Sequence, residues 1–264
     1  MSRKRPTEEQ KEELLENRAH YVNQAAQAIK NADYLLLSIG AGFSADSGLA
    51  TFQTIAQVPV YQKKNHSYVY LCNPDHFLTN PQLAYGFWGK TVNDYKTTKP
   101  HFGHEVILKW KNQFFQEAPG DKDKKFFIYS SNIDEQPQMA GFDENEIYEI
   151  HGSSKIWQCV NGYECPSESA KKNRLWRVPE EYKFDIDEET LLAEENEFIF
   201  SENAEKTQEN NELQEKIKQA FASNHPKCIH CGGLARPAVL MFGDRYWVSD
   251  TKGRRNYRNW ESNM

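Results

Sequence analysis

The amino-acid sequence predicts an α/β protein built around a parallel sheet, and three observations support this fold class. Residues 8–30 carry apolar side chains at helical spacing, and a short apolar run over 34–39 follows them and ends at a glycine. Two further apolar runs, over 125–129 and 146–150, are each followed by polar residues. Helices that alternate with buried strands are typical of a doubly wound α/β domain, whose ligand site lies at the strand ends.

The first predicted element is a helix over residues 8–30. Thr7 and Gln10 form the pattern of a capping box ahead of it. The apolar positions that follow recur every three or four residues, as one face of a helix requires; they are Leu15, Ala19, Val22, Ala26 and Ile29. The run over 34–39 that comes next has the length and composition of a buried strand.

The later elements alternate in the same way. Helices are predicted over 81–96 and 104–115, and buried strands over 125–129 and 146–150. Parallel strands need a crossover between them, and this order supplies one. A further apolar run over 238–242 is predicted to be a buried strand.

Residues 180–220 differ in composition from the rest of the chain, because they include fourteen acidic and four basic residues. This balance predicts a solvated helix or a partly disordered insertion, with a role in partner binding as the alternative. A basic tail follows later and is expected to be solvated; it contains Arg245, Lys252, Arg254, Arg255 and Arg258.

Composition excludes several classes of protein. The chain has 264 residues, of which 38% are hydrophobic, so a packed core is expected rather than disorder. The net charge of −6 speaks against direct binding to nucleic acid. No apolar run has the length of a membrane span, and the N-terminal residues lack the apolar stretch of a signal peptide. We therefore expect a cytoplasmic or nuclear protein, whose oligomeric state the sequence does not indicate.

The glycine turn 40-GAGFSA-45 follows the first strand and fits the pattern G-x-G-x-x-G/A. Backbone without side chains can approach a diphosphate closely, which favours a nucleotide site. The same turn also occurs for packing alone. No acidic residue stands about 20 positions later on a second strand, as an ordinary dinucleotide fold would need.

The five cysteines suggest a metal site rather than disulfides. Cys228 and Cys231 have the spacing of a zinc knuckle, and Cys159 and Cys165 form the second pair of a predicted four-cysteine zinc site. His225 and His230 are possible substitute ligands, and buried free thiols are the alternative. Cys72 is predicted to be such a buried free thiol.

Four strings, taken together and in this order, resemble the sirtuin family of NAD-dependent protein deacylases. They are 40-GAGFSADSG-48, 130-SSNID-134, 151-HGS-153 and 228-CIHCGGLARPAVLMFGD-244, and the likeness is to the divergent, bacterial-type branch. The resemblance implies a Rossmann-like NAD-binding domain over 1–150 and 233–264, and a zinc-binding lobe over 151–232 that contains the acidic insertion 180–220. It also implies further strands that this sequence lacks, so we expect a C-terminally truncated form with the last strands missing.

The resemblance implies roles for individual residues. His151 would be the general base, Asn132 would hydrogen-bond the ribose or a water, and Asp134 would bind the nicotinamide carboxamide. Phe52 would cover the nicotinamide pocket. The implied NAD-binding residues are Gly40, Ala41, Gly42, Ser44, Phe52, Gln53, Ser131, Asn132, Ile133 and Asp134, and those that pair with an acylated-lysine substrate are Val239, Phe242 and Gly243. The chain departs from the family at Thr51 and Gln53, where an Asp and an Arg are typical.

The function that the resemblance implies is an NAD-dependent protein-lysine deacetylase or deacylase. It would consume NAD and release nicotinamide and O-acyl-ADP-ribose, with zinc in a structural role. Two alternatives stay open. One is mono-ADP-ribosyl transfer on the same scaffold, and the other is a catalytically degenerate protein that binds NAD, zinc and a partner.

Overall fold

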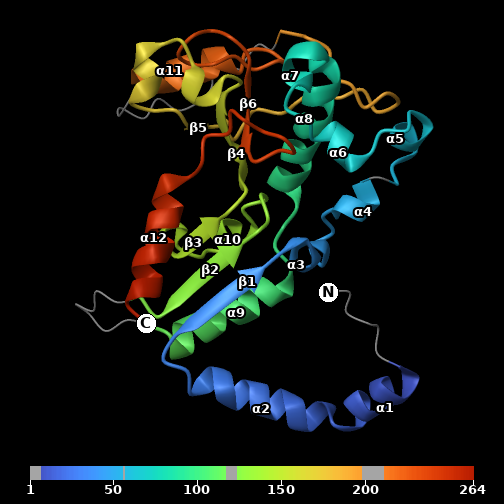
Figure 1. Ribbon diagram of the computed structural model, residues 1–264, viewed down its shortest axis with the longest axis vertical. Coiled ribbons are helices and arrows are strands. Elements are labelled where there is room, and N and C mark those ends of the chain that lie inside the picture. The colour runs from blue at the N-terminus through green and yellow to red at the C-terminus, as the bar shows by residue number, and fades with distance from the viewer. Residues whose placement is uncertain (1–6, 56, 117–123, 198–210) are drawn as a thin grey trace.

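A three-stranded parallel sheet forms one half of the molecule (Figure 1). The computed structural model describes residues 7–55, 57–116, 124–197 and 211–264. The strands run in the order β1-β2-β3, with Leu35 opposite Phe126 and Ile128 opposite Ile147. Their bounds are β1 (Leu35–Ile39), β2 (Phe126–Ser130) and β3 (Ile147–Glu149), which confirms the three predicted strands to within a residue or two.

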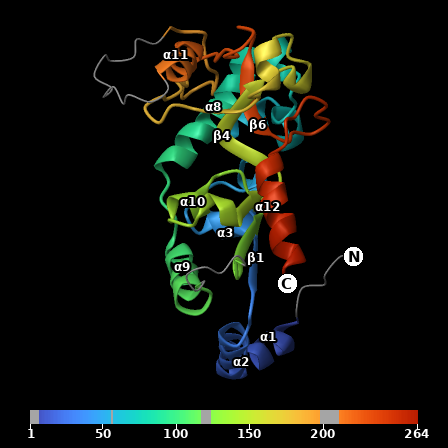
Figure 2. The same cartoon turned by 90° about the vertical axis from the view of Figure 1, so that its left-hand side faces the viewer.

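Two helices cover opposite faces of this sheet, as Figures 1 and 2 show. They are α9 (Phe102–Phe114) and α12 (Thr251–Ser262). Alternate residues of β2 point to opposite faces: Phe126 and Ile128 belong to the core beneath α9, whereas Phe127 packs against Trp260 of α12 with ring centroids 5.6 Å apart. The predicted basic tail is therefore in part a helix anchored by an aromatic residue.

The N-terminal helix differs from its prediction. The capping box is confirmed, since Gln10 N donates to Thr7 Oγ1 at 3.3 Å and Thr7 N to Gln10 Oε1 at 3.0 Å. The helix is not continuous, however, and its two parts are α1 (Glu8–Glu16) and α2 (Arg18–Lys30). Asn17 separates them, and its side-chain amide donates to Glu13 O at 3.0 Å. Asparagine competes for backbone groups in this way, which explains the break.

A second sheet forms the other half and is antiparallel, in the order β5-β4-β6. It packs on the long helix α8, where the Tyr85 hydroxyl donates to Ala235 O of β6 at 2.7 Å. Val239 ends β6, so the predicted strand over 238–242 is wrong beyond it: Leu240 is 41% and Phe242 52% exposed. The bounds are α8 (Pro81–Thr97), β4 (Gly152–Cys159), β5 (Trp176–Arg177) and β6 (Ala235–Val239).

Short helices connect these elements. They are α3 (Ala41–Ala45), α4 (Phe52–Ile55), α5 (Pro59–Lys63), α6 (Tyr68–Leu71), α7 (His76–Thr79), α10 (Gln136–Met139), α11 (Asn211–Ala220) and the 3₁₀ turns η1 (Glu144–Glu146), η2 (Gly162–Glu164) and η3 (Glu168–Lys171). None of the described helices is long and apolar enough to cross a membrane.

The acidic segment is only in part what its composition predicts. Residues 180–197 are not a solvated helix, because Tyr182, Phe184 and Ala193 are buried against the larger core. The end of the segment is helical, as α11, and buries Ile217. Residues 198–210 lie outside the described part of the chain.

Gly86 of α8 shows how closely the acidic segment packs. A Cβ at this position would lie 2.2 Å from Leu191 O. We expect Gly86→Ala to lower the free energy of unfolding by about 1–3 kcal/mol, because the backbone of the segment must move away. Thermal unfolding measures this, with Gly42→Ala as the control, since nothing lies within 4 Å of a Cβ there. Equal stability of the Gly86 variant and the parent chain would contradict the packing.

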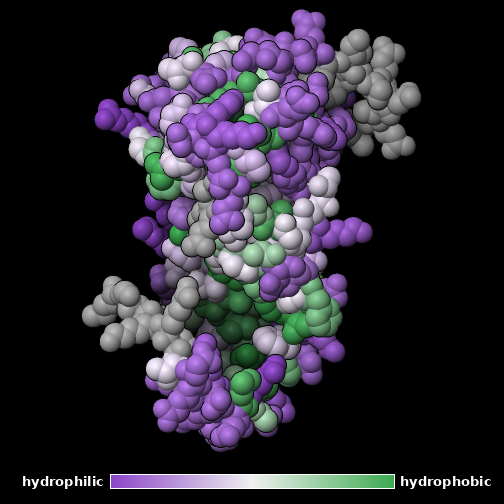
Figure 3. All heavy atoms as spheres, turned by 90° about the vertical axis from the view of Figure 1, so that its right-hand side faces the viewer, coloured by the Kyte–Doolittle hydropathy of each residue, from purple (hydrophilic) through white to green (hydrophobic). Residues whose placement is uncertain are grey.

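One face of the molecule is hollowed and apolar in its lower half (Figure 3). A groove of about 770 Å³ lies there between α2 and α9, and Val22, Phe102 and Trp110 line it. The side chains of Val22 and Phe102 are 58% and 73% exposed. The side of α2 that lines this groove is therefore not buried in the core.

Candidate active site

A cavity of about 500 Å³ lies where the C-terminal ends of the parallel strands meet the loop after β6. Parallel α/β sheets place their ligands at this end. The structure brings together ten of the residues that the sequence predicts for the site, and they line this cavity: Ala41, Ser44, Ser131, Asn132, Ile133, Asp134, His151, Val239, Phe242 and Gly243.

Four predicted residues are not among those that line the cavity. A Cβ on Gly40 would lie 3.1 Å from Ser131 Oγ, so this glycine allows the loops after β1 and β2 to pack closely. Gly42 has open space beside it. Phe52 and Gln53 belong to α4, but their side chains lie outside the described part of the structure, and their roles stay predictions.

Ser44 joins the loops after β1 and β2 through hydrogen bonds. Its hydroxyl donates to Asp134 Oδ2 at 2.6 Å and accepts from Asn132 Nδ2 at 2.8 Å. Asn132 Nδ2 also donates to Gly40 O at 3.0 Å. All three side chains are buried, so the network fixes one wall of the cavity.

Asp134 is the titratable group of this wall and is 3% exposed. Burial raises its pKa above the ordinary value, although the hydrogen bonds from Ser44 and Gln136 N act in the opposite direction. An aspartate in this setting offers a strong acceptor to a ligand donor.

His151 lies between β3 and β4, and its imidazole contacts the loop after β2. Nδ1 is 2.9 Å from Ser131 O. A carbonyl oxygen can only accept, so Nδ1 carries the proton and Nε2 keeps its lone pair. The ring is thereby held in the tautomer of a base.

An ion pair between the start of β6 and the loop that follows this strand escaped the sequence prediction. The Arg236 guanidinium bonds both carboxylate oxygens of Asp244 at 2.8 Å, and the two side chains are 1% and 0% exposed. The pair closes the loop that carries Phe242 and Gly243. Opposite charges on both sides of a short apolar strand were the signal that could have revealed it.

The wall opposite Asp134 is aromatic and apolar. Tyr68, Met241 and Phe242 line it, and the rings of Tyr68 and Phe242 meet edge to face with centroids 6.1 Å apart. The sequence prediction did not include Tyr68 or Tyr95, which also lines the cavity. They stand in a long aromatic and polar stretch that carries no recognisable spacing.

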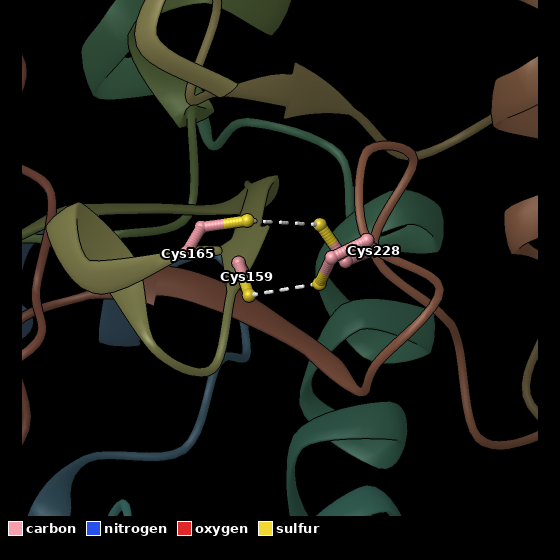
Figure 4. Close-up of side chains that lie close together, drawn as sticks. Cys159, Cys165 and Cys228 are labelled. Carbon is pink, nitrogen blue, oxygen red and sulfur yellow. Dashed lines mark hydrogen bonds between the residues drawn. The ribbon is translucent and has the colours of Figure 1, made fainter. Parts of the chain in front are cut away.

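The predicted metal ligands form one cluster, shown in Figure 4. The Sγ atoms of Cys159, Cys165, Cys228 and Cys231 all lie within 4.8 Å of one another. The Sγ atoms of Cys159 and Cys231 are 3.8 Å apart, and those of Cys165 and Cys228 are 4.0 Å apart. Tetrahedral zinc with bonds of about 2.3 Å needs sulfurs about 3.8 Å apart, so the four residues fit this ion.

The other cysteine and histidine candidates have different roles. His225 Nε2 lies 2.8 Å from Ala193 O, and His230 bonds Ser169 and Asn173 O, so neither joins the cluster as a substitute ligand. Cys72 is 2% exposed and lies outside the cluster, which confirms it as a buried free thiol.

Comparison with known proteins identifies a family whose model matches this chain. The model of the Sir2 family matches residues 40–185. An NAD-dependent protein deacylase of Candida albicans is 25% identical over 213 residues, which are 80% of this chain and 65% of that protein. One of Aquifex aeolicus is 25% identical over 206 residues, 78% of this chain and 59% of that protein. The chain therefore spans less than two thirds of the length of these relatives.

Solved structures share the fold. A Sir2 homolog–NAD complex superposes with a TM-score of 0.51 at 19% identity, covering 84% of this chain and 62% of that one. Sir2Tm bound to a propionylated peptide gives a TM-score of 0.53 at 18% identity, covering 91% and 71%. The likeness to these structures shows the fold.

Proposed function

Because the chain belongs to the Sir2 family, we propose that it is an NAD-dependent protein-lysine deacylase. The observation that carries the proposal is the cavity, which is lined by Asn132, Asp134 and His151 on one side and by the loop after β6 on the other. Two further observations support the same activity. The relatives are named NAD-dependent protein deacylases, and the similar solved structures include complexes with NAD and with a propionylated peptide.

The residues of the buried wall would hold the nicotinamide end of NAD. Asp134 accepts a hydrogen bond from the carboxamide NH₂, and Ser44 keeps its carboxylate in place. Asn132 lies beside it and can bond the ribose. NAD supplies a cleavable bond between ribose and nicotinamide, and the chain's own task is to orient that bond and exclude water.

His151 would supply the base. Nε2 takes a proton from a ribose hydroxyl, while Nδ1 stays bonded to Ser131 O at 2.9 Å and fixes the ring. After the acyl oxygen has displaced nicotinamide from the ribose carbon, this hydroxyl oxygen would bond the acyl carbon. The bond between that carbon and the lysine nitrogen would break, lysine would leave as the free amine, and water would complete O-acyl-ADP-ribose. Leu240 N donates to His151 O at 2.9 Å, which joins the backbone at the base to the loop after β6.

The loop after β6 would take the acylated peptide. Leu240 and Phe242 are exposed, and an extended peptide can pair with backbone beside them. The acyl chain would enter between Tyr68, Met241 and Phe242, whose side chains suit an apolar group. The cysteine cluster would hold structural zinc, because four thiolates leave no open position for catalysis.

The test is an NAD titration by calorimetry together with nicotinamide release from NAD on an acetyl-lysine peptide. Binding and peptide-dependent release support a deacylase. Transfer of the ADP-ribose label to protein, without loss of acetyl, would favour the mono-ADP-ribosyltransferase. Binding without release in any assay would favour an interaction protein, and no NAD binding would contradict the proposal.

Asp134→Asn separates binding from stability. The raised pKa means that the folded protein holds the proton of this carboxyl more tightly than the unfolded chain, so its contribution to stability is lost as pH rises. At pH 7 the neutral Asn variant removes a buried charge but also one of the two acceptor oxygens, so it is expected to stay folded and to bind NAD at least tenfold more weakly. Thermal unfolding and calorimetry at pH 7 measure both, and unchanged NAD affinity would remove the role of Asp134.

A further inference from the structure

A second cavity of about 300 Å³ lies behind the first, and only one layer of backbone separates them. The same three segments line both cavities with successive residues. Asp134, His151 and Val239 line the first, and their chain neighbours Glu135, Gly152 and Ala238 line the second. The groups in the rear cavity can therefore set the position of the wall in front.

The turn at Glu135 is the part of this layer that needs support. Its φ of 58° is left-handed, which a residue other than glycine adopts only at a cost in energy. The side chain is buried and accepts from Ser153 Oγ at 2.6 Å and from Arg177 at 2.7 Å. These contacts hold the carboxylate, but the strained backbone needs a partner of its own.

Glu149 is that partner. One oxygen of its carboxyl group accepts from Glu135 N at 3.2 Å, and the other accepts from Gln138 Nε2 at 3.1 Å. Glu149 ends β3 and lies two residues before His151. One side chain thus joins the end of β3 to both ends of the turn that follows Asp134.

We propose that Glu149 is a positioning residue for the candidate active site, which holds the Asn132–Asp134 wall through the left-handed turn at Glu135. The proposal rests on the proposed function, because it assigns Glu149 to the binding of the nicotinamide end of NAD. Glu149 does not line the front cavity, so it acts through the turn and not on the ligand.

The environment of Glu149 fits a fixed support. Burial raises its pKa well above the ordinary value, and the nearby carboxylates of Glu135 and Asp134 raise it further. A neutral amide of the same shape can therefore replace the carboxyl group. Gln138 Oε1 has no partner in the described structure, so a turned Gln138 amide could accept from that replacement.

Three variants of the full chain test the role, with the KM for NAD and kcat for nicotinamide release as readouts. Glu149→Leu is expected to raise KM tenfold or more with a smaller change in kcat, because the wall that binds nicotinamide loses its support. Glu149→Gln is expected to stay within about threefold of the parent on both, since it keeps the shape and the acceptor.

Glu146→Leu is the matched control. Glu146 also lies beside β3 and is buried, but it pairs with Lys111 and Lys124 and is not among the residues that line either cavity. It is expected to lower the melting temperature and leave KM unchanged. If Glu149 had only a structural role, both Leu variants would lose stability and neither would change KM.

An unchanged KM in a folded Glu149→Leu variant would overturn the proposal. If this variant does not fold, Gln138→Leu replaces it, with a rise in KM of about threefold expected and no rise overturning the proposal. A parent chain that does not bind NAD at all would instead contradict the proposed function, so the two failures are distinct.

Discussion

Cys228→Ser is expected to release zinc from the cysteine cluster and to unfold the half of the molecule that contains β4 and β6. Cys228 lies in the loop before β6. It is close to Cys159, which ends β4, and to Cys165, which follows β4. Binding of structural zinc contributes roughly 10–16 kcal/mol in small zinc modules, and three remaining ligands hold it far less tightly. Metal analysis and near-ultraviolet circular dichroism measure both losses.

Cys72→Ser is the control for this substitution. Cys72 is as buried as Cys228, at 2% against 3% exposure, but it lies outside the cluster. The control should keep one zinc per chain and its aromatic signal. Equal zinc in the Cys228 variant would contradict the four-thiolate site. Zinc loss without a change in the aromatic signal would show that the core around Trp157 holds the lobe together alone.

The parts of the fold that could be predicted are those set by local patterns. Apolar runs over five or six residues predicted the three parallel strands. β2 is almost wholly buried, as its composition predicts, whereas β1 exposes Leu36 and Ser38. The acidic segment was mispredicted because contacts distant in sequence decide its structure. It was predicted to be solvated, yet Phe184 packs on Tyr85 of α8, and Tyr182 packs on Phe221, which follows α11.

The residues of the candidate site were likewise predicted where a local pattern marks them and missed where none does. Asn132, Asp134 and His151 follow strand ends, so the rule for parallel sheets predicts that they meet. The cysteine pairs meet although 62 residues separate them, because thiol spacing is itself a pattern. Arg236 and Asp244 were missed because an ion pair can be recognised only when both partners are placed, and Glu149 because its partners are backbone and amide groups.

His151→Ala is expected to reduce the release of deacetylated lysine peptide by about 10²–10⁴-fold, the usual contribution of a general base. The imidazole lines this wall, and the bond from Nδ1 to Ser131 O favours the tautomer in which Nε2 can accept a proton. NAD binding should persist, because Ser44, Asn132 and Asp134 keep their mutual hydrogen bonds without it. Single-turnover release and calorimetry separate the two effects.

The pattern across both assays decides how His151 acts. Lost release with retained affinity identifies a base, since only the transition state needs the proton transfer. Lost affinity would mean that the ring instead supports the loop after β2, which it contacts through the bond between Nδ1 and Ser131 O. His20→Ala, which changes an exposed histidine of α2, should alter neither quantity. Release at the parental rate in the His151 variant would leave the cavity without a base and the proposed chemistry without a mechanism.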